Sequence, residues 1–405
     1  MLVPVLRGVP ASGLIVLLLG LIAAVPARAD VGGPAIVAHL NAQRAAQGVP
    51  AGIVESPALS AACAKHNAYG AINKVLAHEE DPSRQGYTPE GDYAAGSSVL
   101  YQGSGPWSAT HNPFETAPIH LHQLLAPRLD QMGASENQGY GCATSLASRN
   151  RPAPPGDVAY TYPGNGAKGW PAAQVAAEGP YTPGERVGIP AGTQTGPYLY
   201  VMFDGPDLTP FDDATATGAS LTGPQGAVNI AVVDNHTSGL ENFLPTGMQV
   251  IPRAPLRPGT TYTASVAASV TTQGGIGPPR AFSRAWSFTT VQLPAFALFS
   301  GSPRSLRVSK AGRFSYSFVA TPGLAGTMSV TSTRKVKIGS KKRTMKLGSK
   351  GFIAPANGKL KVKFKLSSKN LRALKWRSSL RFAIVVKLGS KTFNAKLKLK
   401  RPKRS

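Results

Sequence analysis

The stretch Phe114–Gly133, FETAPIHLHQLLAPRLDQMG, decides the fold of the N-terminal part of the chain. It predicts a short helix. Thr116 can accept a backbone N–H bond at the helix start, and Pro118 suits the first turn, where its missing N–H breaks no hydrogen bond. We expect the helix to stop near Pro127, because proline cannot continue it.

Two histidines lie on this predicted helix. On a helical wheel His120 lies at the edge of the apolar face formed by the leucines, and His122 lies at the other margin of that face. A His-x-His pair shares a face on a strand, but on a helix the two rings diverge by roughly 200°. The pair by itself therefore does not predict a metal site.

Two further helices are expected upstream. Pro34 opens the first, and Gly48 is its stop signal. Ser56 and the proline after it open the second, on which Cys63 and His66 fall at the spacing of a buried face. For His66 this spacing favours a position in the core over a functional role.

Residues 1–29 have the pattern of a secretory signal peptide. Arg7 precedes an apolar run over residues 14–25, and Ala-Arg-Ala at 27–29 is an A-x-A cleavage signal, so the mature chain is expected to begin near Asp30. No later apolar run approaches the roughly 20 residues that a membrane helix needs. The sequence thus predicts an extracellular or cell-surface protein without a transmembrane segment, whose remaining length suits two to four domains.

The chain contains two cysteines, Cys63 and Cys142. They fit an oxidising compartment and one disulfide across the N-terminal domain, and the alternative is a pair of buried thiols. Two cysteines are too few for a four-ligand zinc knuckle.

Charge divides the chain sharply. Residues 301–405 hold 29 of the 44 Lys and Arg and none of the 19 Asp and Glu, whereas residues 30–300 hold 13 basic and 19 acidic residues. The formal charge of +25 is therefore a property of the C-terminal region.

Several short motifs recur in order through the N-terminal region, and they resemble those of the bacterial CAP family. These are the SCP-like domains related to cysteine-rich secretory and plant pathogenesis-related proteins. The resemblance covers roughly 115 residues and is carried by Leu40-Asn41-x-x-Arg44-x-x-x-Gly48, Leu59-x-x-x-Cys63-x-x-His66, Leu76-x-His78, Ala117-Pro118-x-His120-x-x-x-Leu124-Leu125-x-Pro127 and Gly133.

This resemblance implies an α-β-α sandwich, with a small antiparallel sheet between helical layers. It also implies a cleft that contains two histidines and usually two acidic residues. By position the histidines are His78 and His120. Asp92 stands where the family has a glutamate, with a side chain one methylene shorter, and Phe114 stands where bacterial members often have tryptophan.

Two imidazoles and one or two carboxylates facing a cleft can bind zinc. Three interpretations stay open: a zinc or other divalent site on His78 and His120, a metal-free histidine cleft, and structural histidines. No catalytic residue is predicted, since the chain lacks H-E-x-x-H and G-x-S-x-G. Ser97 and Ser98 are candidate nucleophiles, but the sequence shows no third group to orient a base.

From residue 151 the composition shifts to Pro, Gly and Ala, and short strands separated by turns are expected. Leu199–Phe203 predicts a buried strand. The segments 255–263 and 286–290 are similar to the last strands of bacterial Ig-like domains of the S-layer-associated kind. The region is therefore expected to be a β-sandwich that acts as a spacer.

In the C-terminal region lysine alternates with apolar residues, most clearly over Lys359–Leu366 and again over Phe393–Lys400. This pattern predicts half-buried strands with one cationic face. That face can serve solubility and edge protection alone, or it can bind anionic cell-envelope polymers or lipid head groups. Nucleic acid is disfavoured, because no aromatic residues are interleaved with the lysines as in a stacking platform.

The sequence therefore predicts a multidomain protein with a signal peptide at 1–29. An α+β CAP domain (30–150) is followed by two all-β sandwich-like domains, one Ig-like (151–295) and one strongly basic (296–405). The leading hypothesis is a secreted, non-enzymatic protein that binds a small apolar or envelope-derived ligand in a cleft with His78, His120 and Asp92. The alternatives are a metal-assisted hydrolase that uses His78 and His120, and a purely adhesive surface protein.

Overall fold

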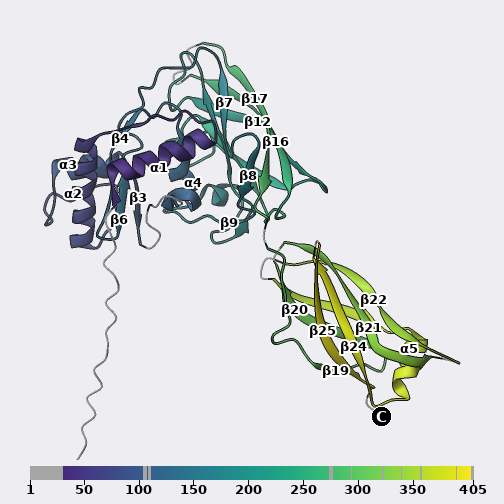
Figure 1. Ribbon diagram of the computed structural model, residues 1–405. Coiled ribbons are helices and arrows are strands. Elements are labelled where there is room, and N and C mark those ends of the chain that lie inside the picture. The colour runs from purple at the N-terminus through teal and green to yellow at the C-terminus, as the bar shows by residue number, and fades with distance from the viewer. Residues whose placement is uncertain are drawn as a thin grey trace, which may run out of the picture.

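The computed structural model describes residues 31–103, 107, 111–272, 277–292, 294–321, 323–338, 340–355, 358–388 and 390–402. In this part of the chain the protein is multidomain and built mostly from paired sheets, with a few helices (Figure 1). The predicted signal peptide lies outside the described residues. Within them no helix is long and apolar enough to cross a membrane.

The N-terminal region contains a four-stranded antiparallel sheet with helices on both faces. Its strand order is β1 (Val31–Gly32), β5 (Ala134–Asn137), β6 (Tyr140–Ala143) and β3 (Val99–Gln102). Leu100 and Cys142 point to α2 (Pro57–Asn73) and α3 (Pro89–Gly96), where they join a small apolar cluster. Their neighbours Val99 and Ala143 point to the opposite face and join a core with α1 (Gly33–Ala46) and α4 (Pro118–Leu125).

The predicted disulfide is confirmed. Cys63 on α2 is bonded to Cys142 on β6, which lies 79 residues later in the chain. The bond ties the helical layer to the middle of the sheet. Closing so long a loop stabilises the folded state by restricting the unfolded chain.

The second region is a two-sheet sandwich. One sheet has the order β14 (Ile230–Asp234), β15 (Gly247–Pro252), β11 (Leu199–Asp204), β7 (Val158–Tyr162); the other has the order β13 (Gly226–Ala227), β12 (Asp213–Gly223), β16 (Thr261–Thr271), β17 (Arg280–Thr290), β8 (Ala167–Trp170). Val201 and Val250 of the first sheet and Trp286 of the second share one apolar core between the sheets. The predicted strand Leu199–Phe203 is confirmed as part of β11.

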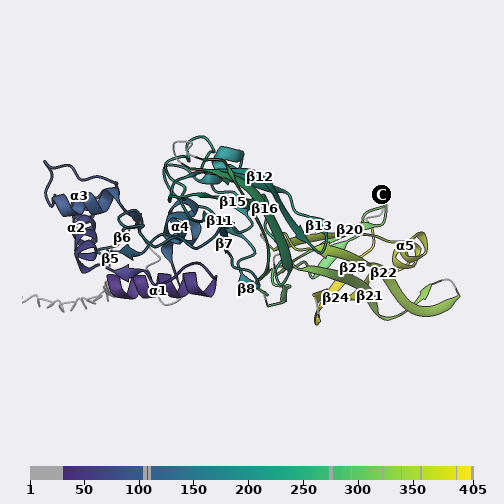
Figure 2. The same cartoon turned by 90° about the horizontal axis from the view of Figure 1, so that it is seen from above.

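The outer face of the β11 sheet packs on α4. Tyr200 and Met202 alternate with the inward residues of β11, and they belong to the same core as Leu121 and Leu124 of α4. Figure 2 shows α4 next to β11 and β15, with which it makes the contacts His122–Tyr200 and Pro118–Gln249. One hydrophobic core therefore contains residues from both sides of position 150. The predicted domain boundary at that position stays a prediction.

The start of α4 differs from the expectation that Thr116 caps it. Thr116 ends a 3-10 turn, η1 (Pro113–Thr116), and the N-cap position of α4 is Ala117, which has no side-chain oxygen to offer. The predicted end is confirmed, since α4 stops at Leu125, two residues before Pro127.

The carboxyl end of α4 is held by Arg44 of α1. The guanidinium donates hydrogen bonds to the carbonyls of Leu124 (2.6 Å), Ala126 (3.0 Å) and Pro50 (2.7 Å). Leu124 lies in the last turn of α4, where backbone carbonyls have no partner within the helix, so a buried cation satisfies its carbonyl. Burial lowers the pKa of Arg44 to about 9, which keeps the side chain charged at neutral pH.

The C-terminal region is a second sandwich with its own core, formed within residues 295–399. One sheet has the strand order β18 (Ala297–Leu298), β20 (Arg313–Ala320), β23 (Lys359–Lys365). The other sheet has the strand order β19 (Ser305–Arg307), β25 (Lys391–Lys400), β24 (Ser379–Leu388), β21 (Ala325–Ile338), β22 (Lys341–Ile353). The predicted alternation is confirmed in β23, where Lys361 and Lys363 are exposed and Val362 and Phe364 are buried.

His122 lies in the interface between α4 and the β11 sheet. The expectation placed it at the margin of the buried face, but the ring is completely buried because β11 and β15 cover that side of the helix. Its ring contacts Tyr200 edge to face at 5.8 Å, and Nδ1 lies 3.3 Å from Nε2 of Gln249. Burial lowers the pKa of His122 to about 3, and the nearby Arg149 adds to this effect.

We predict that His122 makes the protein sensitive to acid. In the unfolded chain its pKa is about 6.5, so between about pH 6.5 and 3 the unfolded state binds a proton that the folded state does not. Stability therefore falls as the pH drops through this window, by up to about 1.4 kcal/mol per pH unit from this group. His122→Gln is expected to remove that part of the slope in urea titrations from pH 7 to pH 4.

The exposed His236 offers a matched control. His236→Gln is expected to leave the slope as it is in the wild-type protein. Equal slopes for His122→Gln and the wild type would show that the acid sensitivity comes from other groups.

Candidate functional site

Two adjoining cavities share His78, His120, Gly179 and Pro180, and together they form the cleft. The first has a volume of about 290 Å³ and is lined by His78, Gly96, Ser98, Ile119, His120, Gln123, Leu146, Gly179, Pro180, Tyr181, Asn242 and Phe243. The second has a volume of about 410 Å³ and adds Leu76, Ala77, Leu100, Tyr101, Gln102, Pro113, Phe114, Ala117, Ala177 and Glu178. The cleft thus draws its walls from both the helical N-terminal region and the first sandwich.

His78 lies in the segment that follows α2. Its Nδ1 is 3.0 Å from the carbonyl oxygen of Ala95 in α3. A carbonyl can only accept, so Nδ1 carries the proton and Nε2 keeps its lone pair. His78 is partly exposed, and the burial of the rest of its ring lowers its pKa. His120 and His66 lower the pKa further, whereas the hydrogen bond to Ala95 raises it.

His120 lies in the first turn of α4 and is oriented by Glu178. Its Nδ1 is 3.0 Å from Oε2 of Glu178, whose side chain is fully buried. The same carboxylate accepts hydrogen bonds from the backbone N–H of Ile119, 3.0 Å from each oxygen, and from that of His120 at 3.4 Å. It takes the place at the helix start that Thr116 was expected to fill, where an acidic group is favoured by the helix dipole.

Burial raises the pKa of Glu178, and the bonds from His120 and from the start of α4 counteract this. The bonds therefore offset part of the cost of burying the carboxylate, and burial remains the larger effect. Nδ1 of His120 is directed at this carboxylate, so Nε2 is the nitrogen that faces away from Glu178, and it is the acceptor in the neutral imidazole.

The two imidazoles lie parallel. Their ring centroids are 6.4 Å apart and their planes differ by 12°. Phe114 closes one side, with its ring 5.6 Å from that of His120. Both Nδ1 atoms are anchored by the protein, so the two Nε2 atoms are the basic positions that the pair presents to a ligand.

Asp92 is placed differently from the other two predicted residues. It lies in the first turn of α3, its Oδ1 accepts the backbone N–H of Glu80 at 2.7 Å, and it lines neither cavity. Glu80 in turn lies 3.0 Å from Nδ1 of the buried His66. The structure thus brings His78 and His120 together and gives Asp92 a local structural contact.

Glu178 was missed by sequence reasoning. It stands 58 residues after His120, in the region interpreted as a spacer. The sequence offers one hint of its role: Glu178 is the single acidic residue between positions 171 and 184, in a stretch rich in Pro, Gly and Ala.

A resident zinc ion does not fit this cleft. Catalytic zinc takes three protein ligands and a water. His78 and His120 supply two nitrogens, and Glu178 is engaged with His120 and the start of α4. In the part of the chain that the structure describes, no group of three or more His, Cys, Asp or Glu side chains is arranged to hold a metal ion.

The two candidate serine nucleophiles are both engaged in structural contacts. Ser97 donates to the carbonyl of Tyr93 at 2.8 Å. Ser98 lines the smaller cavity, but its Oγ lies 3.2 Å from Sγ of Cys142.

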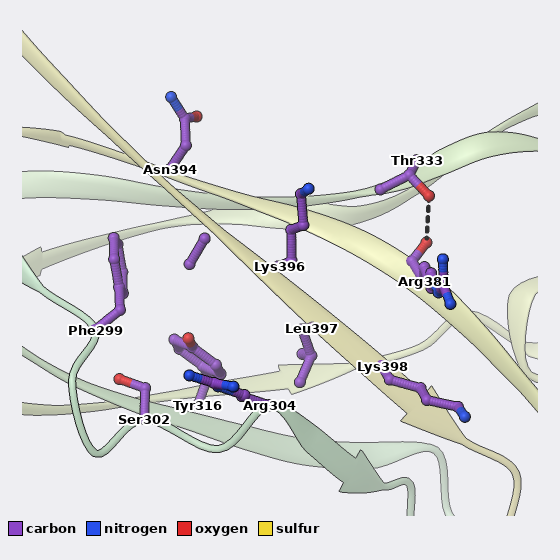
Figure 3. Close-up of a pocket in the computed structure, with 11 residues that line it drawn as sticks. Phe299, Ser302, Arg304, Tyr316, Thr333, Arg381, Asn394, Lys396, Leu397 and Lys398 are labelled. Carbon is purple, nitrogen blue, oxygen red and sulfur yellow. Dashed lines mark hydrogen bonds between the residues drawn. The ribbon is translucent and has the colours of Figure 1, made fainter.

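A separate cationic cavity of about 760 Å³ lies in the C-terminal sandwich (Figure 3). Four cations and two aromatic rings are among its lining residues, namely Arg304, Arg381, Lys396, Lys398, Phe299 and Tyr316. Arg381 of β24 and Lys398 of β25 are direct cross-strand partners. Like charges in this relation destabilise a sheet, and residues 301–405 contain no acid to neutralise them.

No family model matches the chain, and no curated protein matches it. Among solved structures, a tandem of titin Ig domains is 9% identical, with 59% of this chain and 92% of that chain covered and a TM-score of 0.24. The fibronectin(III)-like modules of Clostridium thermocellum CbhA are 7% identical over 60% of this chain and 94% of that chain, with a TM-score of 0.17. Native alpha-2-macroglobulin from Escherichia coli is 10% identical over 51% of this chain and 67% of that chain, with a TM-score of 0.23. At such TM-scores these similarities carry no argument about this chain.

We predict that Glu178 is needed for the stability of the cleft. Glu178→Ala leaves the Nδ1–H of His120 and the N–H of Ile119 buried without an acceptor, and each such group costs about 1–3 kcal/mol. The free energy of unfolding, measured by urea titration, is expected to fall by at least about 1 kcal/mol.

Glu79 provides the control, since it is exposed. Glu79→Ala is expected to change the free energy of unfolding by less than about 0.5 kcal/mol. A similar small change in Glu178→Ala would mean that water replaces the carboxylate at no cost, contrary to this account.

Proposed function

We propose that the protein is secreted and non-enzymatic, that it binds a small amphipathic ligand in the cleft around His78 and His120, and that its basic sandwich holds it near the cell envelope. The observation that supports this best is the anchoring of both Nδ1 atoms, by Ala95 and Glu178, which leaves two oriented acceptors in a mostly apolar cleft. The ligand is expected to bring an apolar body and a hydrogen-bond donor.

The walls of the cleft support an apolar ligand body. Ile119, Leu146 and Phe243 line the smaller cavity, and Leu76 and Leu100 line the larger one. Binding pockets of this kind combine apolar walls with a few fixed polar groups that set the orientation of the ligand. Because the protein holds both rings in place before binding, little ordering is required when the ligand enters.

The CAP-like assignment of the N-terminal region is part of this proposal. Helices cover both faces of its small antiparallel sheet, as the resemblance implies. Arg44 and Asn41 of the first motif have structural roles, because Asn41 binds the backbone of Gly52 and Ile53 and Arg44 binds the end of α4. The motif residues thus support the fold around the cleft.

A hydrolase that uses the same cleft is the second candidate. The bond from Glu178 to Nδ1 of His120 is the observation that favours it, since a carboxylate oriented in this way raises the basicity of a general base. It ranks second because the serine that lines the cleft, Ser98, is engaged with Cys142. Loss of a hydrolytic activity in His120→Ala, with the fold retained, is the result that would place it first.

The ligand proposal predicts a preference for a hydrogen-bond donor. A dansyl-labelled dodecanol and its methyl ether share one apolar body, but only the alcohol can donate to Nε2. We expect the alcohol to bind about fivefold more tightly, because one hydrogen bond contributes about 1 kcal/mol. In the His78→Ala/His120→Ala variant this preference should disappear, as measured by fluorescence titration.

His236→Ala, which changes an exposed histidine, should leave the preference intact. Equal affinity of the wild-type protein for the alcohol and the ether would contradict the proposed role of the two imidazoles.

The envelope proposal makes its own prediction for the cationic cavity in Figure 3. Arg381→Gln/Lys396→Gln/Lys398→Gln is expected to weaken binding to poly(glycerol phosphate) by about tenfold at low salt, because three cations that line one cavity are lost. Lys361→Gln/Lys363→Gln/Lys365→Gln removes the same charge from the exposed face of β23 and should have a smaller effect. Equal effects in calorimetric titrations would mean that only net charge matters.

A further inference from the structure

Trp376 is the most exposed large apolar side chain among the described residues, with 85% of its surface accessible. The other tryptophans are covered: Trp107 and Trp286 are 2% exposed, and Trp170 is half-buried. Indole carries a large apolar surface that is highly buried on average in proteins, so Trp376 stands apart from the other tryptophans of this chain.

The exposure of Trp376 does not arise from a loose segment. It follows directly after α5 (Ser368–Lys375), which Ser367 caps and which Leu374 anchors, fully buried in the core of the sandwich. Asn370 also donates to the carbonyl of Lys346 at 3.0 Å, which ties α5 to β22. The helix therefore fixes the backbone position from which the indole extends into solvent.

A hollow of about 700 Å³ lies beside this indole. It is bounded by α5 and by the adjoining ends of β21 and β22, and its charged lining consists of Lys337, Arg343, Lys369, Arg372 and Arg377. Figure 1 shows α5 at the end of this sandwich opposite to the entry of the chain from the preceding region. The hollow shares no lining residue with the cationic cavity in Figure 3.

This combination of groups fits an acidic sugar chain. The flat C–H face of a pyranose packs on an indole, and three of the five cations are arginines, whose planar guanidinium binds a carboxylate through two hydrogen bonds. A protein surface that binds a membrane is convex and apolar, whereas the cations here line a concave hollow. A single-stranded nucleic acid would be met by several aromatic rings, and here one is present in the lining.

We propose that Trp376 and the surrounding cations form a binding site for an anionic glycan of the uronate type. A sugar ring stacks on Trp376, and the carboxylates of neighbouring sugars bind Arg372, Arg377 and Arg343. The site rests on the proposed envelope attachment and names the class of polymer that it takes.

The test uses the mature full-length protein with oligogalacturonate as the probe and its fully methyl-esterified form as the uncharged counterpart. Acrylamide quenching of tryptophan fluorescence reports mainly on Trp376, because the other indoles are covered. Oligogalacturonate is expected to protect Trp376 and to bind at least about tenfold more tightly than its ester. Trp376→Ala lacks this reporter and is followed by calorimetric titration; it should bind oligogalacturonate about fivefold more weakly, the loss of one aromatic contact.

Arg372→Gln/Arg377→Gln should abolish the preference for the charged glycan. Lys361→Gln/Lys363→Gln, which removes the same charge elsewhere, should change the affinity by less than about twofold. Binding of the dansyl alcohol in the cleft and the urea midpoint verify that each variant is folded.

Three results would overturn the proposal. The first is unchanged affinity for oligogalacturonate in Trp376→Ala. The second is protection of Trp376 by vesicles of anionic phosphatidylglycerol but not by the glycan, and the third is tighter binding of a single-stranded oligonucleotide than of the glycan. If the wild-type protein fails to bind oligogalacturonate but binds poly(glycerol phosphate), this site is rejected and envelope attachment stands. If the wild-type protein binds neither polymer, envelope attachment is rejected as well.

Discussion

Helix α4 is held at its two ends by opposite charges from distant parts of the chain, and the arrangement of the cleft depends on this. The carboxylate of Glu178 meets the N–H groups at the start, and the guanidinium of Arg44 meets the carbonyls at the end. Each charge matches the sign of the helix dipole at its end, and each satisfies groups that an eight-residue helix leaves without partners. The position and rotation of α4 are thereby set, and with them the direction of His120.

The same helix fills the space between two sheets. Leu121 and Leu124 share one core with Tyr200 and Met202 of β11, while His122 stays neutral within that interface. The cleft lies where these layers meet, so its walls combine residues on both sides of position 150. A ligand bound there contacts both regions at once, which makes the site a property of their packing.

Local patterns in the sequence predicted local structure well. Ser56 caps α2, lysines and apolar residues alternate in β23, and Cys63 pairs with Cys142. Contacts made through tertiary packing escaped prediction. A helical wheel predicts the one face that the apolar residues of the helix form. His122 is buried because the β11 sheet packs on another side of α4, and the helix sequence alone does not predict that contact. For Glu178 no motif or spacing links it to His120, and its role arises only when the first sandwich packs on α4.

The shared core also bears on how such a protein is inherited. A recombination event that carried residues 31–150 alone into another gene would deliver an α4 whose start and outer face are stripped of their partners. Only a transfer of the helical region together with the first sandwich would keep these contacts intact. The basic sandwich, whose core is formed within residues 295–399, is free to be exchanged, duplicated or replaced separately.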